Sequence, residues 1–80
     1  MIAIVDYGAG NIFSVKNALD YIGVENKLTA DAKDLVNADR IILPGVGAFP
    51  WAMKMLNSSG LVDVIREQAK VKPFLGICLG

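Results

Sequence analysis

The sequence predicts an α/β fold in which parallel strands form an open sheet with helices on both faces. Short apolar runs alternate with segments whose apolar residues recur at helical spacing, a pattern typical of consecutive βαβ units. The first apolar run is continuous rather than alternating, which suits a strand that is covered on both faces. A chain of 80 residues is enough for one small domain.

The first strand is expected over residues 1–6, followed by a loop over residues 7–11. The apolar residues of the next segment fall on one helical stripe: Ile12, Val15, Leu19 and Ile22. Asn11 is the expected N-cap of this helix, and Gly23 is expected to end it in a left-handed conformation.

A weaker second strand is expected over residues 25–29, a short helix over residues 31–37 and a third strand over residues 40–43. The charged residues of the helical segments are expected on solvated faces: Lys33, Asp34, Glu67 and Lys70.

Two helical segments, residues 51–56 and 60–70, follow the third strand and are separated by an interruption over residues 57–60. The side chains of the second segment that are expected to face the sheet are Leu61, Val64, Ile65 and Ala69. A fourth strand is expected over residues 73–77.

The only cysteine, Cys78, follows this fourth strand and has a glycine two residues away on either side. A buried strand that ends in a sharp, glycine-flanked turn can present a nucleophile above a sheet. A lone cysteine is also often a small core residue, so the neighbouring motifs have to decide between the two interpretations.

The third strand ends in the sequence Pro44-Gly-Val-Gly, which taken alone is an ordinary turn. An acyl transfer at Cys78 would need backbone N–H donors for the oxyanion, which this loop and the amide of Leu79 could supply. Both loops must then lie side by side, which predicts parallel strands in the order 2-1-3-4.

The composition argues against several classes of protein. Eight basic and eight acidic residues leave no net charge, so neither a nucleic-acid partner nor an anionic membrane is expected. The absence of histidine and the single thiol argue against a metal site. One cysteine fits a reducing cytoplasm, and the apolar run at residues 1–5 is too short for a signal peptide or a membrane span.

The glycines at positions 8 and 10 follow a strand and open a helix, as in a dinucleotide-binding loop. The third glycine of that fingerprint would fall at Phe13, so the motif fails and no cofactor is expected. A nucleotide-binding module without enzymatic activity remains an alternative that depends on Gly8 and Gly10 alone.

Three motifs, MIAIVDYGAGN, LPGVGAF and KPFLGICLG, occur in this order and together extend over the whole chain. Their combination resembles the glutaminase subunits of imidazole glycerol phosphate synthase, within the class I glutamine amidotransferase family. The resemblance implies a three-layer, open, mostly parallel sheet of flavodoxin-like type. It also implies that residues 1–80 are the N-terminal part of a single amidotransferase domain, truncated after the fourth strand and inactive without the histidine and glutamate of the missing part.

The resemblance further implies roles for individual residues. Cys78 is the nucleophile that attacks the side-chain amide of glutamine, and the amides of Val46 and Leu79 form the oxyanion hole. Gly45 and Gly47 match the strand that reorients to complete this hole.

Asn11 matches a position near the partner subunit. That partner is a (βα)8-barrel synthase, which uses the released ammonia to make imidazole glycerol phosphate in histidine biosynthesis. Another class I amidotransferase, or a cysteine hydrolase on the same type of sheet, remains an alternative.

Overall fold

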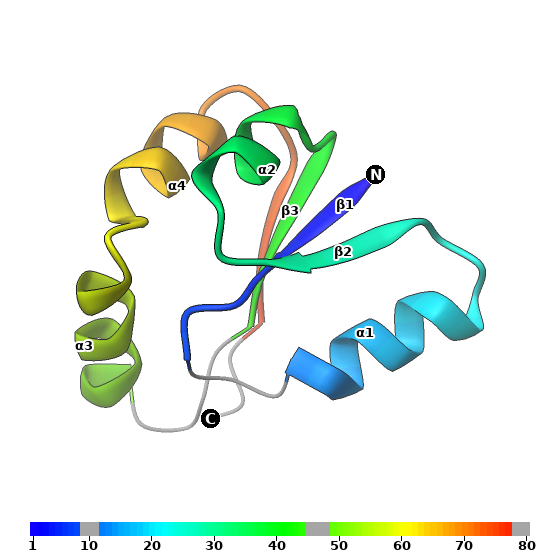
Figure 1. The fold of residues 1–80 in the computed structure, drawn as a ribbon, viewed down its shortest axis with the longest axis horizontal. Helices are drawn as coiled ribbons and strands as arrows, with labels where there is room; N and C mark the ends of the chain where they lie inside the picture. Colours follow the sequence, from blue (N-terminus) through cyan, green and yellow to red (C-terminus); the bar gives the residue numbers. More distant parts are fainter. Residues whose placement is uncertain (9–11, 45–48, 78–80) are drawn as a thin grey trace.

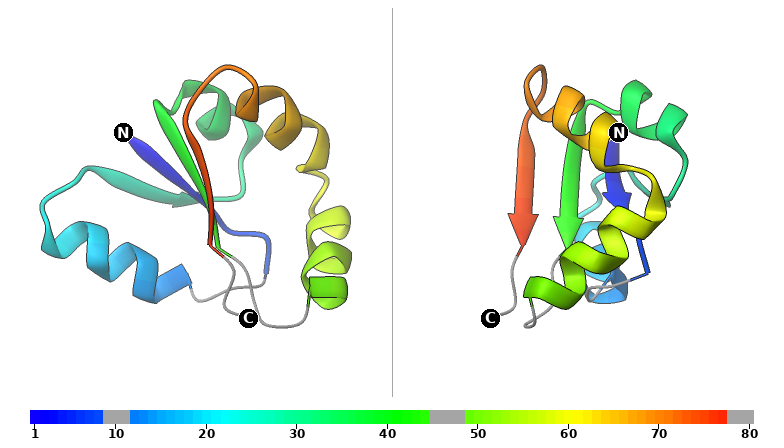
Figure 2. Two further views of the ribbon diagram at one scale, coloured as in Figure 1. Left: turned by 180° about the vertical axis from the view of Figure 1, so that it is seen from behind. Right: turned by 90° about the vertical axis from the view of Figure 1, so that its left-hand side faces the viewer.

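The computed structural model describes residues 1–8, 12–44 and 49–77, with the backbone alone for residues 49–53 and 77. Within these residues, a four-stranded parallel sheet runs in the order β2-β1-β3-β4 (Figures 1 and 2). Its strands are β1 (Ile2–Val5), β2 (Asn26–Thr29), β3 (Arg40–Pro44) and β4 (Phe74–Ile77). The predicted strands and their order are confirmed.

The sheet is covered on both faces, as predicted. The helices are α1 (Ile12–Tyr21), α2 (Ala32–Asn37), α3 (Phe49–Ser59) and α4 (Val62–Ala69). α1 lies on one side of the sheet, and α2, α3 and α4 lie on the other (Figures 1 and 2). This arrangement of helices, sheet and helices is the expected three-layer architecture.

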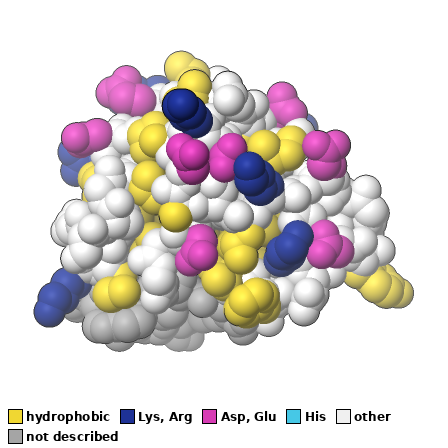
Figure 3. Space-filling view, in the orientation of Figure 1, with side chains coloured by type: hydrophobic (Ala, Val, Ile, Leu, Met, Phe, Trp, Pro, Cys, Tyr) yellow, Lys and Arg dark blue, Asp and Glu magenta, His cyan; other side chains and the backbone are white. Residues whose placement is uncertain are grey.

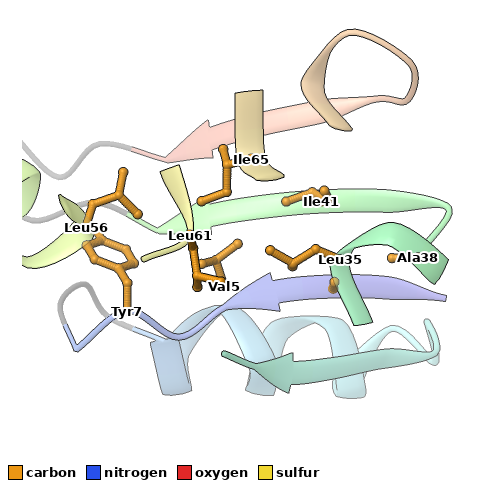
Figure 4. Packing of buried hydrophobic residues seen from close by; sticks show 9 residues of the cluster. Val5, Tyr7, Leu35, Ala38, Ile41, Leu56, Leu61 and Ile65 are labelled. Carbon is orange, nitrogen blue, oxygen red and sulfur yellow. The ribbon is translucent and has the colours of Figure 1, made fainter. Parts of the chain in front are cut away.

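The main core lies between the sheet and the layer of α2 and α4 (Figure 4). Because side chains alternate along a strand, Ala3 and Val5 of β1 face this layer together with Ile41 of β3. Leu35 from α2 and Ile65 from α4 fill the space above them. Burial of these apolar side chains joins the second and fourth helices to the sheet.

The opposite face of the sheet is covered less completely. Ile12, Val15 and Leu19 of α1 are only half-buried, and Ile22 lies beyond the helix and is exposed. The predicted helical stripe is therefore wrong at Ile22, because the chain turns away there and Gly23 takes a φ of +78°. α1 contacts β1 and β2. On this face Ile42 of β3 is still buried at 7% exposure, whereas Leu75 of β4 is 56% exposed in the described part of the chain.

The predicted interruption of the helix near residues 57–60 is confirmed, and it lies at the end of that range. α3 continues to Ser59, and the hydroxyl groups of Ser58 and Ser59 donate to the carbonyls of Lys54 and Leu56 inside the helix. The break comes at Gly60, whose φ of +76° ends the helix.

The core-facing side of α4 agrees with the prediction except at its end. Leu61 and Ile65 are buried, and Val64 packs against the same cluster. Ala69 is exposed, because it is the last residue of the helix and the chain turns from there toward β4.

A lysine ties the start of β4 to the end of α2. The Lys72 ammonium donates to the main-chain carbonyls of Leu35, Val36 and Ala38 at 3.0, 2.8 and 2.7 Å. The last carbonyls of a helix have no partner inside it, and a cation at this end also interacts favourably with the helix dipole. Lys72, which lies in the connection between α4 and β4, therefore caps the C-terminus of α2.

β4 forms an exposed apolar edge in the described part of the chain. It pairs with β3 on one side, and Leu75 is 56% exposed. Unpaired edges of this kind associate with other chains. We expect the isolated 80-residue chain to self-associate at micromolar concentration, measured by sedimentation velocity.

The matched control for this experiment is Leu75→Lys, because a lysine on an edge strand opposes pairing and should shift the chain toward monomer. A wild-type chain that stays monomeric and melts in one sharp transition would show that the edge is not a site of association.

Candidate functional site

The carboxyl ends of the strands meet at one edge of the sheet, which is where open α/β sheets bind ligands. β3 and β4 end in register, with Pro44 paired to Ile77. On the other side of β3, the parallel ladder between β1 and β3 ends at the pair of Ile4 and Ile42. Chain segments that leave β3 and β4 therefore start from neighbouring positions.

The predicted site residues follow these strand ends in the sequence but lie outside the described residues: Asn11, Gly45, Val46, Gly47, Cys78 and Leu79. They belong to three segments that follow β1, β3 and β4, which are adjacent strands in the sheet. The topology thus agrees with a common site, and the roles assigned to the individual residues stay predictions.

Tyr7 is the polar residue that links two of these strand ends. Its hydroxyl group donates a 2.5 Å hydrogen bond to the carbonyl of Pro44. The side chain is 6% exposed, and its ring lies beside Leu56 of α3 (Figure 4). The sequence pattern places Tyr7 in a loop and indicates no role for it, although an aromatic residue with a polar tip directly after a buried strand is a signal for such a contact.

Gly8 follows Tyr7 and turns the chain away from the sheet. Its φ is +89°, a conformation that favours glycine, and a Cβ atom at this position would lie 2.9 Å from the terminal methyl of Met55. The glycine therefore has a structural reason that requires no nucleotide. Gly10, on which the alternative of a nucleotide-binding loop also depends, lies outside the described residues.

At the carboxyl end of β2, hydrogen bonds and an ion pair join side chains of β2 to the start of α2. The Thr29 hydroxyl donates to the Asp34 carboxylate at 2.6 Å and accepts from the backbone N–H of Asp31 at 3.0 Å. Lys27 forms an ion pair with the same carboxylate at 3.0 Å. The expectation that Asp34 lies on a solvated face is therefore wrong, because side chains of β2 hold it.

These contacts stabilise the charged form of Asp34. The hydrogen bond from Thr29, and then that from Lys27, lower the pKa of Asp34 below its usual value. A group whose pKa is lowered by folding stabilises the fold at neutral pH, and this contribution is lost as the pH falls through the lowered value. The end of β2 is thus part of the scaffold of the site.

A different site could be formed by a metal-binding cluster or by a hollow among the described residues. None of them forms a group of three or more histidine, cysteine, aspartate or glutamate side chains that could hold a metal ion. An open hollow lined by Met1, Glu25 and Arg40 lies at the opposite, amino end of the sheet. A second open hollow has Leu19 of α1, Ile42 of β3 and Leu75 of β4 in its lining.

The surface has a mixed character. On the face in Figure 3, basic, acidic and apolar side chains are interspersed, as expected for a chain with equal numbers of positive and negative residues. Within the ranges that the structure describes, no helix is long and apolar enough to cross a membrane.

The fold and the strand ends define a class of protein, and comparison with known families identifies it. The sequence profile described as "Glutamine amidotransferase class-I" matches residues 3–80. The chain therefore belongs to the class I glutamine amidotransferase family.

Within this family, the chain is similar to proteins named "Imidazole glycerol phosphate synthase subunit HisH". The protein from Bacillus cereus strain G9842 is 56% identical, and the match covers all of this chain and 39% of the relative. The protein from Caldanaerobacter subterraneus is 53% identical over the whole chain and 40% of the relative. The protein from Listeria monocytogenes serotype 4a is 52% identical over the whole chain and 39% of the relative. The chain thus spans about two fifths of the length of these relatives.

Proposed function

We propose that this chain is the N-terminal part of a glutaminase subunit of imidazole glycerol phosphate synthase. The full-length subunit hydrolyses glutamine to glutamate in the cytoplasm and passes the ammonia to a (βα)8-barrel synthase partner. The observation that carries the proposal is the register of β3 and β4, in which Pro44 pairs with Ile77 directly before the two predicted loops. The identity of 52 to 57% to subunits of this name supports the same function.

In the proposed reaction, the Cys78 thiolate attacks the side-chain amide carbon of glutamine. A carbon–sulfur bond forms, and the amide N–H groups of Val46 and Leu79 stabilise the negative oxygen of the tetrahedral intermediate. The carbon–nitrogen bond then breaks, and the nitrogen takes up a proton and leaves as ammonia. Water cleaves the resulting thioester, which gives glutamate and restores the thiol.

The proton transfers need a base of suitable pKa, usually a histidine in cysteine-dependent acyl transfer. This chain contains no histidine, so the base belongs to the remainder of the full-length subunit. The 80 residues by themselves are then inactive. Asn11 follows β1 in the sequence and is proposed to contact the barrel partner.

The proposal is tested by labelling the full-length subunit in complex with its partner with a chloroketone analogue of glutamine. We expect one modification, at Cys78, identified by peptide mass spectrometry and prevented by excess glutamine. Labelling should be faster with the partner than without it, because assembly completes the oxyanion hole. Labelling that glutamine does not prevent, or that occurs elsewhere, would contradict the proposed site.

A further inference from the structure

We propose that Tyr7 is a positioning residue for glutamine hydrolysis and acts by fixing the direction in which the chain leaves β3. This inference rests on the proposed function, because the segment after β3 contains the predicted oxyanion donors. It adds a residue from the end of β1 that touches neither the substrate nor the nucleophile.

The hydrogen bond from Tyr7 lies where the backbone ladder between β1 and β3 has stopped. The last pair of this ladder is Ile4 with Ile42, whereas β3 continues to Pro44. Proline has no N–H group, so its carbonyl is the backbone polar group that can tie it to a neighbouring strand. The Tyr7 hydroxyl donates a hydrogen bond to this carbonyl. A side chain thus continues the link between β1 and β3 beyond their last backbone pair.

The bonded carbonyl belongs to the peptide unit that joins Pro44 to the following residue. A peptide unit is planar, so a hydrogen bond that holds the carbonyl also holds the plane in which the chain continues. Pro44 is itself fully buried and paired with Ile77 of β4, and a second contact, on the side of β1, restricts the orientation of its carbonyl. Tyr7 supplies that contact.

Tyr7 is suited to this task because its own position is fixed. Its ring belongs to the buried cluster and lies beside Leu56 (Figure 4). On the preceding side, the backbone N–H of Asp6 donates to the carbonyl of Thr29 at 2.8 Å and so continues the pairing of β1 with β2. On the following side, Gly8 turns the chain at a φ of +89°. The hydroxyl is therefore held at the end of a rigid side chain.

The test is the substitution Tyr7→Phe in the full-length subunit assembled with its partner. The ring and its packing remain, and the hydroxyl group is lost together with its hydrogen bond to Pro44. We expect kcat for glutamine hydrolysis to fall about tenfold to a hundredfold while KM changes little, since small misplacements of catalytic groups cost this much. The matched control is Tyr21→Phe, because Tyr21 is 91% exposed and its hydroxyl should not affect either constant.

A second measurement separates positioning from a general structural role. Alkylation of Cys78 by iodoacetamide needs no oxyanion hole, so its rate should be the same in Tyr7→Phe and in the wild type. The ammonia-dependent reaction of the partner should also be unchanged. A normal kcat in Tyr7→Phe would overturn the inference, and so would loss of folded structure or an equal change in iodoacetamide labelling.

The outcome is separable from the test of the proposed function. If Cys78 is required for glutamine hydrolysis and Tyr7→Phe has a normal kcat, the function stands and the role of Tyr7 fails. If glutamine hydrolysis does not depend on Cys78, the proposed function fails and the inference about Tyr7 fails with it.

Discussion

Replacing Cys78 by serine in the full-length subunit is expected to lower glutamine hydrolysis by at least about a thousandfold, because a serine hydroxyl is far harder to ionise at neutral pH than a thiol. The substitution exchanges one atom, so folding and association with the partner should be preserved. The measurement is glutamate production at saturating glutamine in the assembled complex. This is the largest effect that we expect from a single substitution in the chain.

The control for this substitution is the ammonia-dependent reaction of the partner, measured with ammonium salt in place of glutamine. That chemistry belongs to the other subunit, so Cys78→Ser should leave it unchanged. Loss of both reactions would mean that the variant has failed to assemble. Full glutamine-dependent turnover by Cys78→Ser would eliminate the proposed mechanism.

The proposed mechanism also depends on the strand order. A nucleophile and its oxyanion donors must lie within hydrogen-bond distance of one reacting group. In a sheet of order 2-1-3-4, β3 and β4 are adjacent, and the pair of Pro44 with Ile77 shows that the two strands end at the same level. An order in which β3 and β4 were not neighbours would have separated the segments that follow them by at least one strand.

The sheet could be predicted from the sequence because its signals are local. Continuous apolar runs mark strands that are covered on both faces, and glycines mark the turns that follow. Gly23 was expected to take a left-handed conformation, and its φ of +78° confirms this. The order of the strands followed from a functional argument about Cys78 and the loop after Pro44, and the sheet topology agrees with it.

The errors arose where tertiary contacts override local pattern. Asp34 is expected on the solvated side of a helix, yet the side chains of Thr29 and Lys27 in β2 bind its carboxylate. Ile22 continues an apolar stripe but lies past the end of its helix, where nothing in the described chain covers it. Periodicity reports which side of a helix is apolar and does not report how far the sheet beneath it extends.

The hydrogen-bond partner of Tyr7 could not be predicted for a related reason. Its hydrogen bond joins residues that are 37 positions apart, and no spacing rule connects them. The packing of the ring beside Leu56 and the end of β1 together bring the hydroxyl to Pro44. Such links between strand ends become visible when the register of the sheet is known.

The scaffold beneath the site should depend strongly on one side chain from α2. Leu35 is fully buried and lies in the cluster between the sheet and the layer of α2 and α4. Leu35→Ala removes apolar contact and leaves a cavity, which should lower the free energy of unfolding by about 2–5 kcal/mol. For a domain whose total stability is about 5–15 kcal/mol, this loss is a large fraction. The measurement is urea unfolding of the full-length subunit.

The adjacent residue provides the matched control, since Val36 is in the same helix but is 51% exposed. Val36→Ala removes little buried surface and introduces a better helix former, so its stability should stay within about 0.5 kcal/mol of the wild type. A difference between the two variants therefore measures the burial of Leu35 and not a general sensitivity of α2. Equal losses in both variants, or a loss below about 1 kcal/mol in Leu35→Ala, would show that α2 does not anchor the core through Leu35.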